Sequence, residues 1–174
     1  MINLSVRQQE LSDIDNIVDY FLKSKPEFLT GMGVDLGKLP SRYDWIQLLT
    51  SNFNLPNKVK KFYYLIWILD GLPIGHCNIN KIVFGEEAYM HLHLWNLKNR
   101  KQGLGLQFVK QSIPHFFNQF GLQKLYCEPY SLNPGPNKIL EKLGFVFEKS
   151  YETVPGWINF RQVVNSWYMK VDQL

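Results

Sequence analysis

Residues 92–108 combine residue types that together could hold a phosphate group. They read Leu-His-Leu-Trp-Asn-Leu-Lys-Asn-Arg-Lys-Gln-Gly-Leu-Gly-Leu-Gln-Phe, so an alternating strand leads through a glycine-bearing turn into a helix. Backbone N–H groups at a helix start have no intrahelical acceptor, and the helix dipole is positive there. Gly103 and Gly105 lack a Cβ, so an anion can approach the main chain closely. The pattern predicts an anion site, with a plain strand-to-helix turn as the alternative.

Three anion-binding motifs can be compared with this turn. A P-loop ends in Gly-Lys-Ser/Thr, which is absent here, and a dinucleotide turn needs a third glycine where Phe108 stands. The motif that fits is Arg100-x-x-Gly103-x-Gly105. It resembles the pyrophosphate-binding loop of the GNAT acyltransferase superfamily, usually written Q/R-x-x-G-x-G/A.

The elements around this turn follow from hydrophobic periodicity. Alternating or continuous apolar runs predict strands, and apolar residues three to four apart predict helices. The predicted strands cover residues 2–6, 59–70, 73–84, 88–95, 122–130, 145–151 and 160–171. The predicted helices start at a Ser12–Asp15 capping box, after Ser41, at Leu104 and at Pro134, whereas 28–40 is expected to be a loop. Asp70-Gly71 is typical of a hairpin turn.

This order of elements, β-α-α-β-β-β-α-β-α-β-β, indicates a layered α+β (α/β/α) fold in one domain, residues 1–174. It is also the order of the GNAT fold, a mixed, mostly antiparallel sheet with helices on both faces. A second motif supports the resemblance. Asn133 and the Glu-Lys-Leu-Gly-Phe run at 141–145 are similar to the family's Asn-x-x-Ser…Glu-Lys-Leu-Gly-Phe segment. The two motifs and the element order cover nearly the whole chain.

The composition is that of a globular protein, with 45% hydrophobic and 20% charged residues. The net charge of +4 comes without a Lys/Arg block, so it does not by itself indicate nucleic acid. Cys77 and Cys127 lie in apolar strand-like runs without metal-ligand spacing, so we expect buried free thiols and no metal. The N-terminus lacks signal-peptide features, and the longest apolar run, 62–69, is too short to cross a membrane. A cytoplasmic protein without a membrane partner is expected.

The resemblance implies transfer of an acetyl group from acetyl-CoA, as co-substrate, to a primary amine of a small molecule or of a peptide or protein. Backbone amides of the turn would hold the pyrophosphate. The strand end would splay from its neighbour, and an N–H near Leu94 would polarise the thioester carbonyl. Pro136 replaces the family's Ser, and Asn137 beside it could substitute. The implied acyl-CoA contacts are Leu94, Trp95, Arg100, Lys101, Gln102, Gly103, Leu104, Gly105, Leu106, Asn133 and Asn137.

Transfer to an amine needs a base, and many family members place a Glu on the strand before the loop. The matching position here is Tyr89. His91 and His93 share the strand face of Tyr89 by period two, and histidine has a suitable resting pKa. Each is therefore a candidate catalytic residue. The alternative for each is a packed strand histidine with a satisfied ring nitrogen.

Two further residues are catalytic candidates. Glu128 lies in an otherwise apolar strand, where a carboxylate is costly to bury unless it is paired, so it is either an active-site carboxylate or a structural ion-pair partner. The family's usual general acid is a Tyr, whose position here is Leu140. Tyr130 is near in sequence and could supply the proton, or it could be structural.

The absent Glu and Tyr leave a second function open, a non-catalytic acyl-CoA-binding or regulatory domain. A basic nucleic-acid-binding domain is a third reading, suggested only by the isoelectric point near 9. We expect acyl-CoA and an amine as ligands, no nucleic acid, and a monomer or homodimer.

Overall fold

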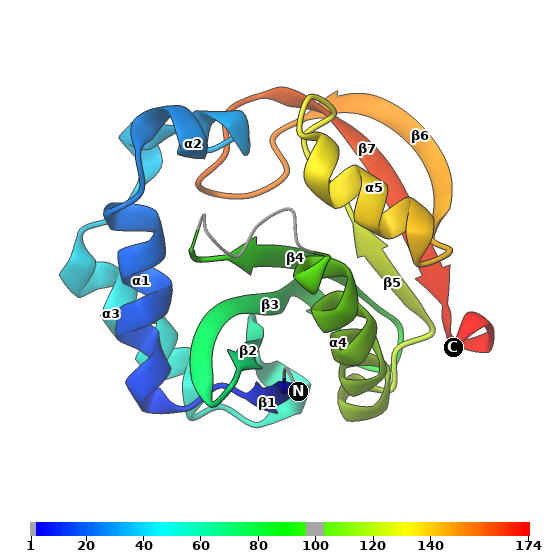
Figure 1. The fold of residues 1–174 in the computed structure, drawn as a ribbon, viewed down its shortest axis with the longest axis horizontal. Coiled ribbons are helices and arrows are strands. Elements are labelled where there is room, and N and C mark those ends of the chain that lie inside the picture. The colour runs from blue at the N-terminus through cyan, green and yellow to red at the C-terminus, as the bar shows by residue number, and fades with distance from the viewer. Residues whose placement is uncertain (1–2, 97–102) are drawn as a thin grey trace.

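The computed structural model describes residues 3–96 and 103–174. Within these residues a seven-stranded sheet has the order β1-β2-β3-β4-β5-β7-β6 (Figure 1). Neighbouring strands are antiparallel, except that β4 and β5 are parallel. The strands are β1 (Leu4–Gln8), β2 (Tyr63–Leu69), β3 (Leu72–Val83), β4 (Glu87–Leu94), β5 (Lys124–Cys127), β6 (Val146–Thr153) and β7 (Gln162–Lys170).

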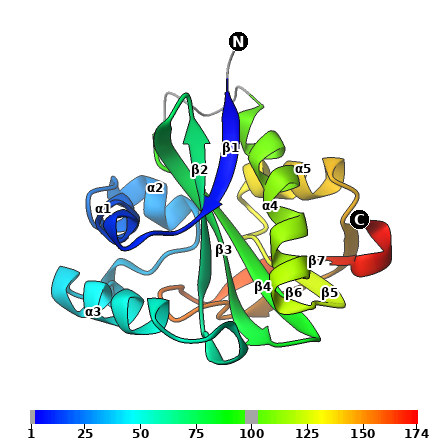
Figure 2. The same cartoon turned by 90° about the horizontal axis from the view of Figure 1, so that it is seen from below.

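Helices cover both faces of the sheet (Figure 2). The helices are α1 (Ile14–Leu22), α2 (Pro26–Gly31), α3 (Arg42–Phe53), α4 (Leu104–Phe120) and α5 (Pro134–Lys142). One apolar core joins the sheet to α4 and to Leu140 of α5, and a second joins the other face to α1, α2 and α3. The layered α+β fold, with a mostly antiparallel sheet, is therefore confirmed.

The predicted order of elements lacked one helix. Residues 26–31 form α2, although 28–40 was expected to be a loop. Pro26 occupies the first turn, where its fixed φ suits a helix and its missing N–H costs nothing. The helix is too short for an apolar stripe to identify it, so periodicity could not reveal it.

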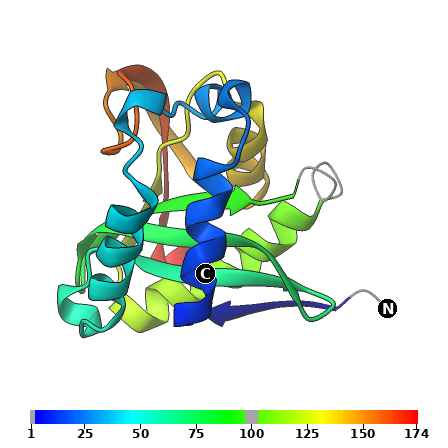
Figure 3. The ribbon, with the colours of Figure 1, turned by 90° about the vertical axis from the view of Figure 1, so that its left-hand side faces the viewer.

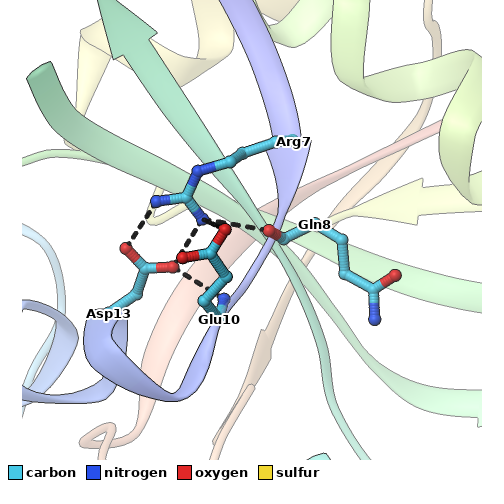
Figure 4. Close-up of polar contacts among 4 residues, drawn as sticks. All are labelled: Arg7, Gln8, Glu10 and Asp13. Carbon is cyan, nitrogen blue, oxygen red and sulfur yellow. Dashed lines mark hydrogen bonds and ion pairs between the residues drawn. The ribbon is translucent and has the colours of Figure 1, made fainter. Parts of the chain in front are cut away.

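The junction between β1 and α1 rests on an ion pair rather than on the predicted Ser12–Asp15 box. Asp13 is buried and accepts two hydrogen bonds from the Arg7 guanidinium, at 2.6 and 2.9 Å (Figure 4). The backbone N–H of Glu10 also donates to Asp13 Oδ2, at 2.7 Å. A bidentate Arg–carboxylate pair is geometrically specific, so it fixes where α1 leaves the strand.

Other predicted boundaries are confirmed. Ser41 Oγ accepts a hydrogen bond from the N–H of Asp44 and so caps α3. Asp70 and Gly71 both have positive φ, 48° and 83°, in the β2–β3 turn. Helix α4 starts at the predicted Leu104 and ends at Phe120, and Gly121, which follows, has a left-handed φ of 62°.

Strands β4 and β5 separate partway along β4, as Figure 1 shows. They pair only over Glu87–Tyr89 and Lys124–Tyr126, whereas β4 stays paired with β3 as far as Leu94. Beyond β5 the chain follows β7 instead, through a bridge between Tyr130 and Val164 and a 2.9 Å bond from Ser131 N–H to Val163 O. The expected splay before the turn is thus present.

The segment after α2 is tied to the connection between β6 and β7, two segments that Figure 3 shows beside each other. Val34 and Asn159 form an isolated bridge, and Asp35 N–H donates to Ile158 O at 2.8 Å. The carbonyl of Gly33 accepts the side-chain amide of Gln162 at 2.8 Å and that of Asn159 at 2.9 Å. These bonds join distant parts of the chain over the α1–α3 side of the sheet.

We expect Gly33→Ala to lower the free energy of unfolding by about 2 kcal/mol. Gly33 has a φ of 86°, and a Cβ there would overlap the side-chain amide of Gln162. Gly31→Ala is the matched control, because no atom lies within 4 Å of its added Cβ, so stability should stay within about 0.5 kcal/mol. Urea unfolding measures both, and equal stability of the two variants would contradict this account of the tie.

Candidate active site

Two hollows meet where β4 ends. The outer groove, of about 610 Å³, lies between the end of β4, the start of α4 and the start of α5. The inner cavity, of about 150 Å³, is lined by β3, β4, the α1–α3 side and the 155–159 connection. Among the described residues, those that line both are Met32, Leu92, His93, Asn133 and Pro136. A ligand in the groove could therefore meet a second ligand in the cavity at this junction.

The start of α4 borders the outer groove, as the glycine pattern predicts. Gly103 caps the helix with a φ of 76°, and no atom lies within 4 Å of the Cβ that it lacks. Gly105 and Leu106 also line the groove, whereas the side chain of Leu104 is buried in the core. Arg100, Lys101 and Gln102, which complete the predicted turn, lie outside the described residues.

His91 and His93 lie on the same face of β4, but their surroundings differ. His91 Nε2 lies 3.0 Å from Asn80 Oδ1, which can only accept, so this network assigns the ring proton to Nε2. Burial, and secondarily the charge of Lys81, lower the pKa of His91 to about 4, which makes it a weak base. His93 lines both hollows, and its Nδ1 lies 3.4 Å from Tyr20 Oη.

A third histidine, His76, was not among the predicted residues. It pairs with His93 across β3 and β4, and it is 1% exposed. Its Nδ1 accepts a 2.7 Å hydrogen bond from Trp95 Nε1. Burial, with a smaller effect of His91, lowers its pKa to about 3. His76 faces His93 because β3 and β4 form a hairpin around Gly85, a turn that the sequence patterns did not predict.

The indole of Trp95 is directed at His76 and packs with the α1–α3 core. Trp95 is not among the residues that line the two hollows, and its predicted contact with acyl-CoA stays a prediction. Its side chain instead anchors the end of β4. Leu94 does line the outer groove, as expected.

Glu128 and Tyr130 both line the inner cavity. Tyr151 donates a 2.5 Å hydrogen bond to Glu128 Oε1, and the Tyr130 ring lies 5.7 Å from the ring of Phe160. Glu128 is the one carboxylate among the described residues of the cavity lining. Burial, then the charge of Glu128, raises the pKa of Tyr89 to about 12. Tyr89, in the position of the family's Glu, is therefore a neutral phenol at pH 7.

Asn133 and Asn137 have different environments. Asn133 begins α5 and lines both hollows. The amide of Asn137 donates to the carbonyls of Tyr130 and Asn133, and its oxygen accepts from Asn165 and Trp167, all within 2.8–3.2 Å. These bonds use its donors and acceptor sites and hold the carbonyl of Asn133, and the predicted contact of Asn137 with the ligand stays a prediction.

A model of the acetyltransferase (GNAT) domain matches residues 3–146, so the chain belongs to the GNAT acetyltransferase family. A search of curated proteins found no match.

Among the described residues, no helix combines the length and apolar character that crossing a membrane requires. Within the same residues, no group of three or more His, Cys, Asp or Glu side chains is placed to hold a metal ion. The thiols of Cys77 and Cys127 are buried and free, as expected.

Solved structures share this fold at low identity. A spermidine N-acetyltransferase from Vibrio cholerae in complex with CoA and spermine is 17% identical, with a TM-score of 0.79 over 98% of this chain and 96% of that one. A ribosomal-protein-S5-alanine acetyltransferase from Vibrio fischeri is 20% identical, with a TM-score of 0.77 over 97% and 93%. An aminoglycoside acetyltransferase in complex with coenzyme A is 15% identical, with a TM-score of 0.73 over 98% and 96%.

The buried His76 should make the protein less stable in mild acid. Its pKa is about 3 when folded and near 6.5 when unfolded, so the unfolded chain takes up the proton first as the pH falls. This contribution to stability is complete above pH 6.5 and is lost progressively toward pH 3. Between pH 7 and pH 5 we expect it to remove about 2 kcal/mol from the free energy of unfolding.

Urea unfolding of His76→Gln at both pH values checks this prediction. Glutamine can still accept the Trp95 hydrogen bond but does not titrate, so the variant should lose that part of the pH dependence. His115→Gln, at an exposed position of α4, should keep it. If His76→Gln retains the full pH dependence, the buried histidine is not its source.

Proposed function

We propose that this protein is an N-acetyltransferase that moves an acetyl group from acetyl-CoA to a primary amine by direct attack on the thioester. The observation that carries the proposal is the meeting of the outer groove and the inner cavity at His93, where β4 has left β5. The groove would hold acetyl-CoA and the cavity the amine. CoA in two of the similar structures supports the first assignment.

The outer groove suits the co-substrate chemically. Amides from Lys101 to Leu106 would bind the pyrophosphate at the positive end of α4. Lys138 and Lys142 of α5 also line the groove and add positive charge. The open space at the missing Cβ of Gly103 leaves room for a phosphate at the backbone.

The end of β4 would face the thioester in this proposal. Trp95 N–H donates to Ile74 O of the β3 side at 2.9 Å. In an antiparallel pair successive residues alternate in direction, so the N–H of Leu94 is directed to the opposite edge, where β5 has diverged. A donor in that direction would polarise the thioester carbonyl and stabilise the tetrahedral oxyanion.

His93 would be the base. A lysine-like amine has a pKa near 10.4, so neutralising it at pH 7 costs about 4.6 kcal/mol, against about 1 kcal/mol for an α-amine near 7.8. His93 lines both hollows, whereas His91 is weakened by burial and held by Asn80. A positioned base contributes roughly 10²–10⁴-fold.

The inner cavity favours an acceptor with one amine. Glu128 is the one carboxylate in its described lining, and the lowered pKa values of His76 and His91 keep both neutral at pH 7. Trp45 and Trp157 provide an aromatic wall, with ring centroids 5.7 Å apart. A small monoamine or a peptide α-amine fits this cavity better than a polyamine with several charges. The buried reduced thiols suit a cytoplasmic location.

Acetyl-CoA should stabilise the protein against unfolding, by about 2.7 kcal/mol at 100 times its dissociation constant. We expect Gly103→Asp to abolish this stabilisation, because the variant places a carboxylate at the phosphate turn. Gly121→Asp is the matched control at the other end of α4, where the glycine also has a left-handed φ. Thermal unfolding with and without acetyl-CoA measures the effect.

Thiol release with an amine panel then identifies the reaction. Monoamines and peptide α-amines should turn over faster than spermine. Stabilisation by acetyl-CoA without thiol release would instead identify an acyl-CoA-binding domain. No stabilisation at millimolar acetyl-CoA would contradict both acyl-CoA functions, and steeply salt-dependent binding to oligonucleotides would then favour a nucleic-acid domain.

His93→Ala should lower kcat/KM for a lysine-like amine by roughly 10²–10⁴-fold, because the amine loses its base. The acidic limb of the pH–rate profile should disappear in the same variant, while acetyl-CoA should still stabilise the protein against unfolding. His115→Ala, at an exposed site on α4, should leave the rate unchanged. An unaltered pH–rate profile in His93→Ala would show that another group is the base.

A further inference from the structure

The inner cavity has a polar patch that the proposed acetyl transfer does not use. Asn78 and Asn80 of β3 line the cavity, as does His91 of β4. Asn78 pairs with His91 on one side and with Tyr64 of β2 on the other. These side chains lie on the same face of the sheet as His93, because residues two apart on a strand share a face. The patch therefore spans three neighbouring strands beside the candidate base.

The side chain of Asn78 is buried without a hydrogen-bond partner. The residue is 6% exposed, and among the described residues no group bonds to its amide nitrogen or oxygen. His91, which lies opposite, instead directs Nε2 at Asn80 Oδ1, at 3.0 Å. A buried amide that forms no hydrogen bond destabilises the fold. At the wall of a cavity, such an amide points to a ligand that completes its bonds.

Two neighbours of Asn78 also have unused hydrogen-bonding groups. Within residues 3–96 and 103–174, the amide nitrogen of Asn80 and the hydroxyl of Tyr64 have no partner. Burial raises the pKa of Tyr64, so its hydroxyl keeps its proton at pH 7. The patch thus offers donors and acceptors together. A hydroxyl or a carboxamide, which both donates and accepts, matches this combination.

The patch has no positive charge beside it. The described lining of the cavity contains neither Lys nor Arg. Lys81 is exposed, with its Nζ 4.6 Å from the centre of the Tyr89 ring, and the Lys60 Nζ donates to two backbone carbonyls at the end of α3. The carboxylate of Glu128 accepts from Tyr151 of β6. Because neutral amides compensate poorly for the burial of an ion, the patch favours an uncharged group.

The spacing between the patch and His93 sets the length of the acceptor. His91 and His93 are two residues apart on an extended strand, which corresponds to about 7 Å. Asn78 lies opposite His91. An extended chain advances about 1.2 Å per bond, so about six bonds cover this distance. An acceptor whose amine lies at His93 would bring its sixth atom to Asn78.

We propose that Asn78, together with Asn80 and Tyr64, selects a small primary amine with a hydroxyl or carboxamide about six bonds from the reacting nitrogen. This inference rests on the proposed function and names its class of acceptor. The amine attacks the thioester beside His93, while the uncharged group exchanges hydrogen bonds with the Asn78 amide. No covalent bond changes at the patch, so Asn78 determines specificity.

A panel of amines of equal length tests the proposal on the wild-type protein. 5-Amino-1-pentanol and 5-aminopentanamide carry the expected groups, hexylamine ends in a methyl, and 1,5-diaminopentane and 5-aminopentanoate carry a second charge. We expect kcat/KM for the hydroxyl and amide compounds to be roughly 10-fold above that for hexylamine, with the charged compounds lower still. Thiol release from acetyl-CoA measures each rate. Hexylamine as fast as the two uncharged polar amines, or a charged amine fastest of all, would overturn the proposal.

Asn78→Leu should remove this preference, because leucine has a similar size and forms no hydrogen bond. The ratio of kcat/KM between 5-aminopentanamide and hexylamine should fall to about 1, with the stabilisation by acetyl-CoA unchanged. The variant should also unfold at a higher urea concentration than the wild type, since it leaves no buried amide unpaired. Asn118→Leu, at an exposed position of α4, is the matched control and should keep the wild-type ratio.

A wild-type ratio in Asn78→Leu would overturn the proposal while leaving the acetyltransferase intact. A wild-type protein that releases no thiol with any amine would instead contradict the proposed function and this inference together. If Asn78→Leu does not fold, the amine panel on the wild-type protein still decides, because it compares acceptors on an unaltered chain.

Discussion

The site depends on the separation of β4 from β5, because this separation directs one edge of the β4 end toward a groove instead of a neighbouring strand. The chain after β5 is held to β7 by the Tyr130–Val164 bridge and the Ser131–Val163 hydrogen bond. Asn137 reinforces this attachment, since its amide joins the Tyr130 and Asn133 carbonyls to Asn165 and Trp167 of β7. These bonds hold Tyr130 and Asn133 in the lining of the inner cavity.

Burial controls the electrostatics of the same region. His76 and His91 lose hydration in the fold, which lowers their pKa values, so neither adds positive charge to the inner cavity at pH 7. An amine that enters meets a single carboxylate and neutral rings. His76 also holds the end of β4, because its neutral Nδ1 accepts a hydrogen bond from the Trp95 indole. Trp95 directly follows β4 and precedes the predicted phosphate-binding turn.

Three similar structures share one fold, and their names mention acceptors as different as spermine, a ribosomal protein and an aminoglycoside. The fold therefore provides the place for acetyl transfer and does not choose the acceptor. In the proposed function the acceptor would be chosen by the walls of the inner cavity, which come from α1, α3 and the tied segments around Gly33 and Asn159. Those segments are far apart in sequence and meet through a few backbone bonds.

The sequence by itself determined the features that local physics controls. Apolar periodicity predicted the strands and α4, Asp70-Gly71 the hairpin and Ser41 the cap of α3, and two spaced motifs identified the family. It missed α2, which is too short for periodicity. It also missed the ion pair at the start of α1, because the Arg7–Asp13 pair depends on how a strand and a helix meet.

Only the tertiary structure decided which side chains share the site. Tyr20 and His93 are 73 residues apart, and Trp95 and His76 are 19 apart, so no local pattern links either pair. The hydrogen bonds of the Asn137 and Trp95 side chains could not be predicted for the same reason, since a polar group buried by folding bonds to whatever the packing brings near it. The order of residues predicted a phosphate-binding turn, whereas the side chains that meet at the two hollows could be identified only from the packing of the sheet and α1.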